Sequence, residues 1–453
     1  MPSLLQERTA RYGRARSRQR GQAIALMLGL LVVGSSALMA LYNVAKVAND
    51  RVRLTHVADM VAYSGAVAQA RSLNLLAYIN RAQVSHHVAM AHLATLASLA
   101  DFTNTQSVQR ANVYPPARLM KSLFGAEVEQ DYARTPIPAH SFAALEQAFH
   151  EHSQIVQHVL AKASSSIAEN MTSFRDEVMA SVLAANYPEY GLSRNSTHPA
   201  AGGIQLSVVN DEAPEALRRY IDHPDSPVRR HIAQEAGKYP FLQERKSVHS
   251  SHRMINPSCP DVHPEVRRYG HTRLDEKGHW VSIDTKSYRP VNRNRKNGCY
   301  LGEQPMGWGQ VSPEGETSER GSSERDRDSL DRNPKAEKYA NQSARHWQVA
   351  GLLDYYNVIL REDSPSLNFR ISLKQPIFTA PAMAALDNVL SRFGRDTFDL
   401  LHSGEGVTVT SDAESYHFEE QERGAGSVHD GLFQPYWHAR LSAGQSTTIG
   451  DSL

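Results

Sequence analysis

Histidine is the residue type that first suggests chemistry, because the chain holds 21 of them in 453 residues. Imidazole binds zinc and copper and exchanges protons near neutral pH. Four histidines stand on two segments that we expect to form neighbouring helices, where they could meet at a metal ion: His86, His87, His92 and His152. Exposed or hydrogen-bonded histidines are far commoner than metal ligands, so we predict no metal site.

The spacing of the other reactive residues matches no catalytic motif. The string FHEHSQ holds His150 and His152 without the HExxH spacing, and His249 and His252 have no carboxylate at a catalytic distance along the chain. GxSxG, P-loop, GxGxxG and paired-carboxylate motifs are missing as well. We therefore expect no catalytic residues, no cofactor and no enzymatic activity. One alternative stays open, an anchored periplasmic metal-binding protein or hydrolase that uses the histidines.

The chain has two cysteines, Cys259 and Cys299. In an oxidising compartment a sparse, even number of cysteines favours one disulfide, which would close a loop of about 40 residues. The rival interpretation is a zinc site, because His263 follows Cys259 by four residues in the stretch CPDVH.

The compartment is indicated by the N-terminal 43 residues. Residues 1–21 hold six arginines and one acidic residue, and the next segment, Ala23 to Tyr42, carries no charge. Twenty apolar residues are enough to cross about 30 Å of hydrocarbon, and arginines before such a run favour a cytoplasmic N terminus. We expect a retained inner-membrane anchor rather than a cleaved signal, although Ala37 to Ala40 could serve as a cleavage site. Nucleic-acid binding is not expected, since the whole chain has a formal net charge of only +1 and no basic pattern follows the leader.

A seven-residue apolar repeat runs through and beyond this anchor, from Leu26 to Leu96. It predicts one continuous helix from about Gln22 to Leu99, about 115 Å long, with a packing seam rich in small residues. The seam comprises Val47, Leu54, Val61, Gly65, Ala68, Leu75 and Ala82. Such a seam suits lateral packing in a bundle or fibre, or the core helix of a tall periplasmic bundle.

After the helix, the pattern changes three times. Prolines break it at residues 112–138, and apolar residues three and four apart predict a second long helix from Ser141 to Asn186, so we expect a periplasmic helical hairpin. Alternation predicts half-buried strands at Gly278 to Thr285 and at Leu367 to Lys374. A further helix is expected at Pro381 to Phe398, and the aromatic stretch from Gly431 to Leu441 is expected to dock.

We therefore predict an α+β protein with five parts. These are a cytoplasmic leader (1–21), a transmembrane anchor (22–43), the helical hairpin (44–190), a periplasmic mixed α/β region (191–441) and a tail (442–453). The mixed region is interrupted at about 312–338 by a charged segment with few apolar residues, which we expect to be disordered.

Stretches in three parts of this chain resemble one family. RQRGQAIALMLGLLVV, the AYSGA string at residues 62–66 and the RxLNxxAYxNRA pattern at Arg71 to Ala82 are similar to the N-terminal region of TadE/TadG-like proteins. These belong to the tight-adherence (Tad, or Flp) pilus assembly systems. WVSIDT and PMGWG resemble the central part of the longer members, and GLFQPYWHARL resembles their ending.

The resemblance implies a pilin-like or pilus-associated envelope protein of a Gram-negative bacterium without catalytic activity. Its implied partners are the inner membrane and other Tad/Flp assembly proteins or like subunits, and cell adhesion is the implied process. Prepilin-type processing would cut between Gly21 and Gln22, but pilins usually carry glutamate at the fifth mature position, where this chain has Leu26. That departure favours a permanently anchored accessory protein.

Overall fold

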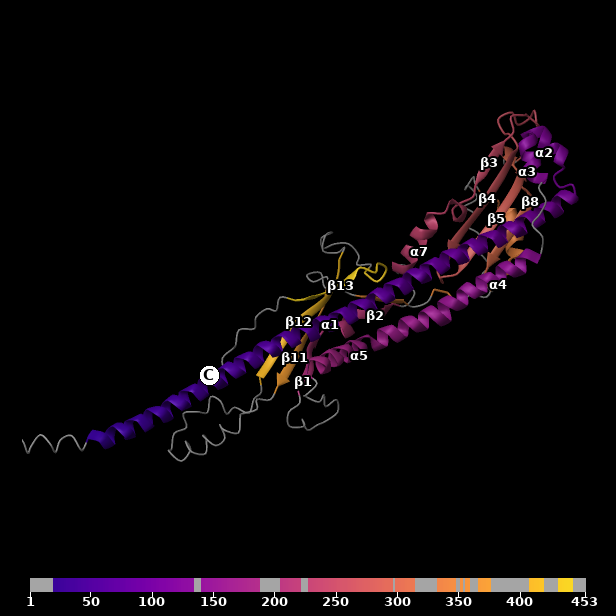
Figure 1. The fold of residues 1–453 in the computed structure, drawn as a ribbon. Coiled ribbons are helices and arrows are strands. Elements are labelled where there is room, and N and C mark those ends of the chain that lie inside the picture. The colour runs from indigo at the N-terminus through magenta and orange to yellow at the C-terminus, as the bar shows by residue number, and fades with distance from the viewer. Residues whose placement is uncertain are drawn as a thin grey trace, which may run out of the picture.

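A computed structural model of the chain describes residues 19–133, 140–187, 204–220, 227–295, 298–313, 332–347, 351–352, 355–358, 366–375, 407–418 and 431–442. Its class is α+β, as predicted from the sequence. One long helix packs against the second long helix and against strands of both larger sheets (Figure 1).

This helix, α1 (Gln19–Ala111), has 93 residues and continues 12 residues beyond the predicted end. It stops just before Pro115 and Pro116, since neither residue supplies a backbone donor and a proline ring does not fit inside a helix. Two short helices follow inside the predicted proline-rich break, α2 (Ala117–Phe124) and α3 (Ala126–Ala133). The proline spacing gave no sign of them.

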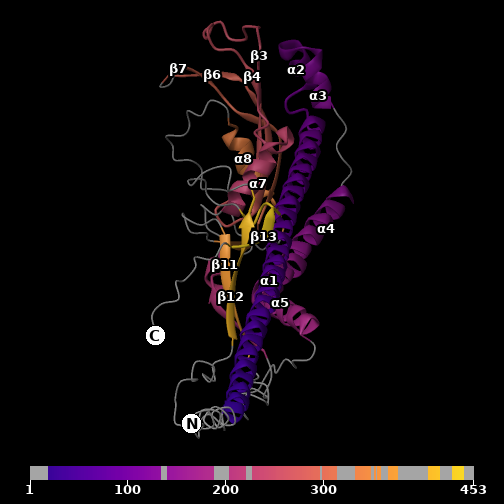
Figure 2. The same cartoon turned by 60° about the vertical axis from the view of Figure 1, so that its left-hand side comes forward.

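The second long helix lies where the apolar spacing predicted it. It consists of α4 (His140–Gln154), one π-helical turn η1 (Ile155–Leu160) and α5 (Ala161–Asn186). All three parts contact α1, and both figures show them along one side of it (Figures 1 and 2). The predicted helix pair is therefore present.

Two sheets also pack against α1, and the first of them contacts α5 as well (Figures 1 and 2). The first is antiparallel, in the order β1 (Gln205–Asp211), β11 (Ser366–Gln375), β12 (Val407–His417) and β13 (Trp437–Leu441). The second has the order β3 (Ser247–Ser250), β4 (Glu265–Leu274), β5 (Trp280–Arg289), β8 (Gln304–Ser312) and β9 (Arg345–His346), with β8 and β9 parallel.

Smaller elements complete the described fold. Two strand pairs stand apart from the sheets: β2 (Leu217–Tyr220) with β10 (Tyr355–Val358), and β6 (Val291–Asn294) with β7 (Gly298–Leu301). The short helices are α6 (Ala213–Ala216), α7 (Pro227–Gly237), η2 (Pro240–Leu242) and α8 (Pro334–Gln342). The disordered insert predicted at about 312–338 overlaps the start of α8, which buries Ala336 and Ala340. The predicted C-terminal boundary of the insert was therefore too late in the chain.

The two predicted strands exist, but their surroundings differ. In β11, Leu367, Phe369, Ile371 and Leu373 are all buried on one face, as the alternation predicts. In β5, by contrast, every residue from Trp280 to Tyr288 is buried, because α1 and α8 both contact this strand. The half-buried expectation for β5 was wrong, since polar side chains at alternate positions are satisfied inside the protein instead of by solvent.

Several sequence predictions fall outside the described residues. These are most of the cytoplasmic leader, residues 314–331 of the insert, the helix expected at Pro381 to Phe398, and the tail after Ser442.

Candidate functional site

The first part of α1 carries an apolar surface that no other described part of the chain covers. Side chains such as Ile24, Met27 and Leu31 are 63%, 73% and 70% exposed. Within the described residues, this is the one helix long and apolar enough to cross a membrane. A continuous apolar surface of this size is unfavourable in water, which makes the segment a candidate membrane span by length and composition.

The seam predicted on α1 is not one face of the helix. Leu54, Val61, Gly65 and Ala68 are buried, Val47 and Ala82 are half-buried, and Leu75 is 49% exposed. A straight helix drifts by about 20° per seven residues relative to a 3.5-residue repeat, so a seven-residue series leaves the buried face after a few turns. Leu75 therefore lies outside the chain's own core, and its part in packing against a partner helix stays a prediction.

Gly65 lies where α1 meets both α5 and the first sheet. A Cβ atom here would be 2.7 Å from Met179 Sδ and 3.1 Å from Phe369 Cζ, closer than packed atoms come. The small side chain at this position of α1 thus allows α5 and β11 of the same chain to pack closely against the helix.

The stretches that carry the family resemblance meet at α1. The Asn74 side chain donates to the Trp437 carbonyl and accepts from the Trp437 amide, both at 2.9 Å. The Asn80 amide donates to the carbonyls of Leu432, at 2.8 Å, and Tyr356, at 3.1 Å. The docking expected for the C-terminal aromatic stretch is therefore present, with these helix residues as its partners.

The central PMGWG stretch is joined to the same helix. Thr105 Oγ1 donates to the Trp308 carbonyl and accepts from the Trp308 amide, the latter at 2.8 Å. A Cβ atom at Gly309 would collide with Ser98 O and come within 2.5 Å of Phe102 N. Glycine is therefore required where β8 crosses the backbone of α1.

The histidines form a pair rather than a cluster. His86 Nδ1 and His152 Nδ1 are 2.7 Å apart, which requires one ring to donate to the other. Burial, with the neighbouring His152, lowers the pKa of His86. His92 instead packs against Tyr239, with ring centroids 4.9 Å apart. Among the described residues, no three His, Cys, Asp or Glu side chains come together in a way that could hold a metal ion.

His87 is the most enclosed of the four. Its side chain is 4% exposed, and its Nδ1 has no hydrogen-bond partner in the described structure. Burial, and secondly the charge of His86, lowers the pKa of His87 to about 4. The ring is therefore neutral at physiological pH and acts as part of the core.

Two buried ion pairs connect the layers, and sequence reasoning missed both. Asp284 on β5 is fully buried and accepts from Arg245 at 2.9 Å and from Ser98 Oγ of α1 at 2.5 Å. Arg175 on α5, 1% exposed, makes two bonds to Asp211 of β1, at 2.9 and 2.8 Å.

Cys259 and Cys299 form a disulfide. It joins the loop that precedes β4 to β7, at the end of the molecule far from the apolar segment (Figure 2). Because both sulfur atoms are used in this bond, the structure offers no zinc ligand at Cys259. His263 has no part in the disulfide.

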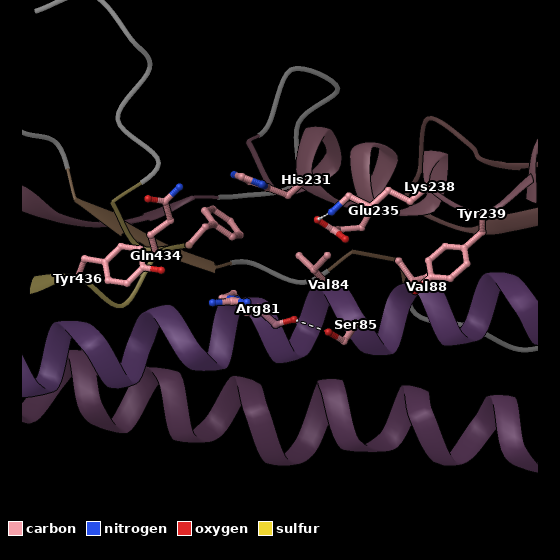
Figure 3. A pocket seen from close by; sticks show the side chains of 11 residues that line it. Arg81, Val84, Ser85, Val88, His231, Glu235, Lys238, Tyr239, Gln434 and Tyr436 are labelled. Carbon is pink, nitrogen blue, oxygen red and sulfur yellow. Dashed lines mark hydrogen bonds and ion pairs between the residues drawn. The ribbon is translucent and has the colours of Figure 1, made fainter. Parts of the chain in front are cut away.

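An open pocket of about 510 Å³ lies between α1, α7 and the C-terminal stretch (Figure 3). Arg81, Val84, Ser85 and Val88 form its floor on α1. Its other sides are formed by His231, Glu235, Lys238, Tyr239, Phe433, Gln434 and Tyr436.

No family model, curated protein or solved structure matches this chain. What the protein does is therefore inferred from its own residues and contacts. The described residues offer an uncovered apolar helix, a scaffold joined at Asn74, Asn80 and Thr105, and an open polar pocket.

Proposed function

We propose that this chain is a non-enzymatic, membrane-anchored accessory component of a Tad/Flp pilus assembly system. The observation that supports the proposal is the convergence of the resembling stretches. Asn74, Asn80 and Thr105 of α1 bind the C-terminal and central stretches through paired or forked hydrogen bonds. Segments about 200 and 360 residues apart thus form one unit, as expected if they were inherited together as one fold.

The proposed topology places the N terminus in the cytoplasm and the sheets in the periplasm, with the inner membrane around Ala23 to Tyr42. Its support is the arginine-rich leader before the apolar segment, together with the uncovered side chains of that segment. The disulfide between Cys259 and Cys299 suits an oxidising compartment.

An accessory role, rather than incorporation into a filament, is favoured by two features. Leu26 stands where a filament subunit would carry glutamate, if Gly21 were the cleavage residue. In addition, Leu54, Val61, Gly65 and Ala68 are buried by the chain's own sheet and helix pair, so they are not available to a neighbouring subunit. Partners would then contact the periplasmic surface.

The first test is the N-terminal sequence and intact mass of the protein purified from inner membranes. A chain that retains Arg20 agrees with a fixed anchor. A chain that begins at Gln22 would contradict it and indicate a minor pilin.

The pilus role itself is tested in the source bacterium. Deletion of the gene is expected to reduce surface pili, measured by electron microscopy, and the intact gene on a plasmid should restore them. Unchanged pilus number in the deletion strain would refute the proposal.

A further inference from the structure

The part of α1 that lies in the core also keeps one exposed face. Met60, Tyr63, Leu75 and Tyr78 are 44%, 47%, 49% and 58% exposed. Met60 and Tyr78 are about five full helical turns apart, so they point in the same direction, and the other two side chains lie beside them. Arg71 is exposed four residues before Leu75. We call these five residues the α1 stripe, in which Arg71 is the one charged residue.

The helix α5 carries a second exposed stripe. Buried residues four apart, from Met171 to Leu183, form its inner face. Phe174 is 48% exposed, and Glu169 and Glu177, five residues before it and three after it, are exposed as well. We call these three residues the α5 stripe. Lys162, the one exposed basic residue of α5, lies about two turns away from Glu169.

The two stripes lie at the same level along the molecule, on helices that are side by side (Figures 1 and 2). The helices are antiparallel, and Gln69 accepts a hydrogen bond from Arg175 Nη1 at 3.5 Å. Arg71, two residues further along α1, is therefore level with the turn of α5 that holds Phe174. Copies anchored by the same segment, Ala23 to Tyr42, stand at one height in the membrane. Arg71 of one copy is then level with Phe174 of the next.

Charge decides which stripes can meet between such copies. Two α1 stripes side by side would bring Arg71 against a second Arg71, and two α5 stripes would bring like glutamates together. One α1 stripe against one α5 stripe instead places Arg71 between Glu169 and Glu177. Like charges opposite each other are unfavourable in an interface, whereas opposite charges fix its register.

We propose that the α1 stripe of this protein binds the α5 stripe of a second copy that stands beside it in the same membrane. Phe174 packs against Leu75 of the neighbouring copy, and Arg71 pairs with the glutamates on either side of Phe174. Each copy carries both stripes, so the contact is heterologous and repeats from copy to copy as a ring or a row. The proposal rests on the membrane topology proposed above, but not on the pilus role.

The test is oxidative cross-linking of the full chain in isolated inner membranes. The native cysteines are bonded to each other, so the introduced ones react. Leu75→Cys together with Phe174→Cys should give dimers and larger multimers on a non-reducing gel, whereas either substitution alone should give monomer. Val209→Cys together with Val248→Cys is the matched control, because both side chains are exposed on strands outside the stripes, and it should give monomer.

Charge reversal tests the pairing. Arg71→Glu in the chain with both introduced cysteines should reduce the multimers at least about tenfold, and further addition of Glu169→Arg with Glu177→Arg should restore them. Arg253→Glu is the control, because Arg253 is exposed in the loop between β3 and β4, and it should leave the multimers unchanged. Multimers that survive Arg71→Glu, or a loss that the reversed glutamates do not restore, would overturn the pairing.

Other results would overturn the contact itself. A dimer from Leu75→Cys alone would show that two α1 stripes meet, and a cross-link to a different protein would show that the partner is not a second copy. Monomer alone in the membrane pellet would refute the contact and leave the topology standing. A chain found in the soluble fraction would refute both.

Discussion

At the scale of single residues, a few buried polar side chains hold distant segments together. Asn80 is fully buried and binds Leu432 and Tyr356, while Asp284 joins a strand to Arg245 and α1. A buried polar group is costly unless it is paired, so each of these residues fixes one arrangement of its neighbours.

Replacing Asn80 is expected to lower the free energy of unfolding. Asn80→Ala removes two hydrogen bonds from a fully buried position, a loss of about 2 kcal/mol. Urea unfolding followed by circular dichroism measures it. The control is Asn170→Ala, because that side chain bonds at the exposed surface of α5 and should change stability by less than about 0.5 kcal/mol. Equal effects of the two substitutions would contradict the role of Asn80.

His87 predicts a dependence of stability on pH. The pKa of His87 is about 4 in the folded protein and 6.5 in the unfolded chain. Between pH 4 and pH 6.5 the unfolded state therefore binds more protons than the folded state. The free energy of unfolding should therefore be highest above about pH 6.5 and fall by about 3 kcal/mol as the pH approaches 4. His271, with a pKa also lowered to about 4 by burial and by Arg273, Arg332 and Arg245, adds a similar slope.

Urea midpoints at several pH values between about 7 and 4 would measure this dependence. His87→Gln should flatten the His87 part of the slope and leave that of His271. Identical slopes for the variant and the wild type would show that His87 titrates normally in the folded state.

At the scale of elements, α1 has two different kinds of surface along its length. Its first turns expose apolar side chains, while from Leu54 to Phe102 the helix is the centre of the core clusters. The second helix and both sheets contact this part, so few positions remain exposed. The seven-residue apolar repeat therefore runs through both an exposed apolar segment and a segment packed inside the protein.

Gly65 tests the internal role of the small residues. Gly65→Leu places a side chain into space already filled by Met179 and Phe369, and we expect a loss of about 3 kcal/mol in the free energy of unfolding. Gly237→Leu is the matched control, because nothing lies within 4 Å of a Cβ atom there. Urea unfolding compares the two. Unchanged stability of Gly65→Leu would show that α5 and β11 can move away from α1.

At the scale of the whole molecule, the apolar N-terminal segment of α1 makes few contacts with the rest of the described protein, although both belong to one continuous helix. Side chains from Ile24 to Leu41 are mostly exposed, whereas the core begins near Leu54. The body, with its sheets, helix pair and distal disulfide, stands on this segment (Figures 1 and 2).

Removal of residues 1–43 should therefore change whether the protein needs detergent for extraction, but not its stability toward urea. The shortened chain is expected in the soluble fraction after centrifugation, whereas the full chain should require detergent for extraction. Its urea midpoint should equal that of the full chain, because the removed side chains support no part of the core. A lower midpoint would mean that the segment contributes to the fold.

The sequence by itself determined the long helices, the apolar N-terminal segment, β11 and the α+β class. These follow from local patterns: apolar periodicity, proline positions and alternation depend on neighbours in the chain. The short helices α2, α3 and α8 were missed, because their eight or nine residues are fewer than the window of about 11 to 18 residues over which apolar periodicity is read.

The tertiary structure decided which faces of these elements are covered and by what. In the folded protein, β5 is buried on both faces and Leu75 is exposed. His92 packs against Tyr239 and not against the other histidines. It also brought Arg81 next to the C-terminal stretch, about 350 residues away in the chain. Such contacts follow from packing between distant segments, which the local pattern of either segment does not encode.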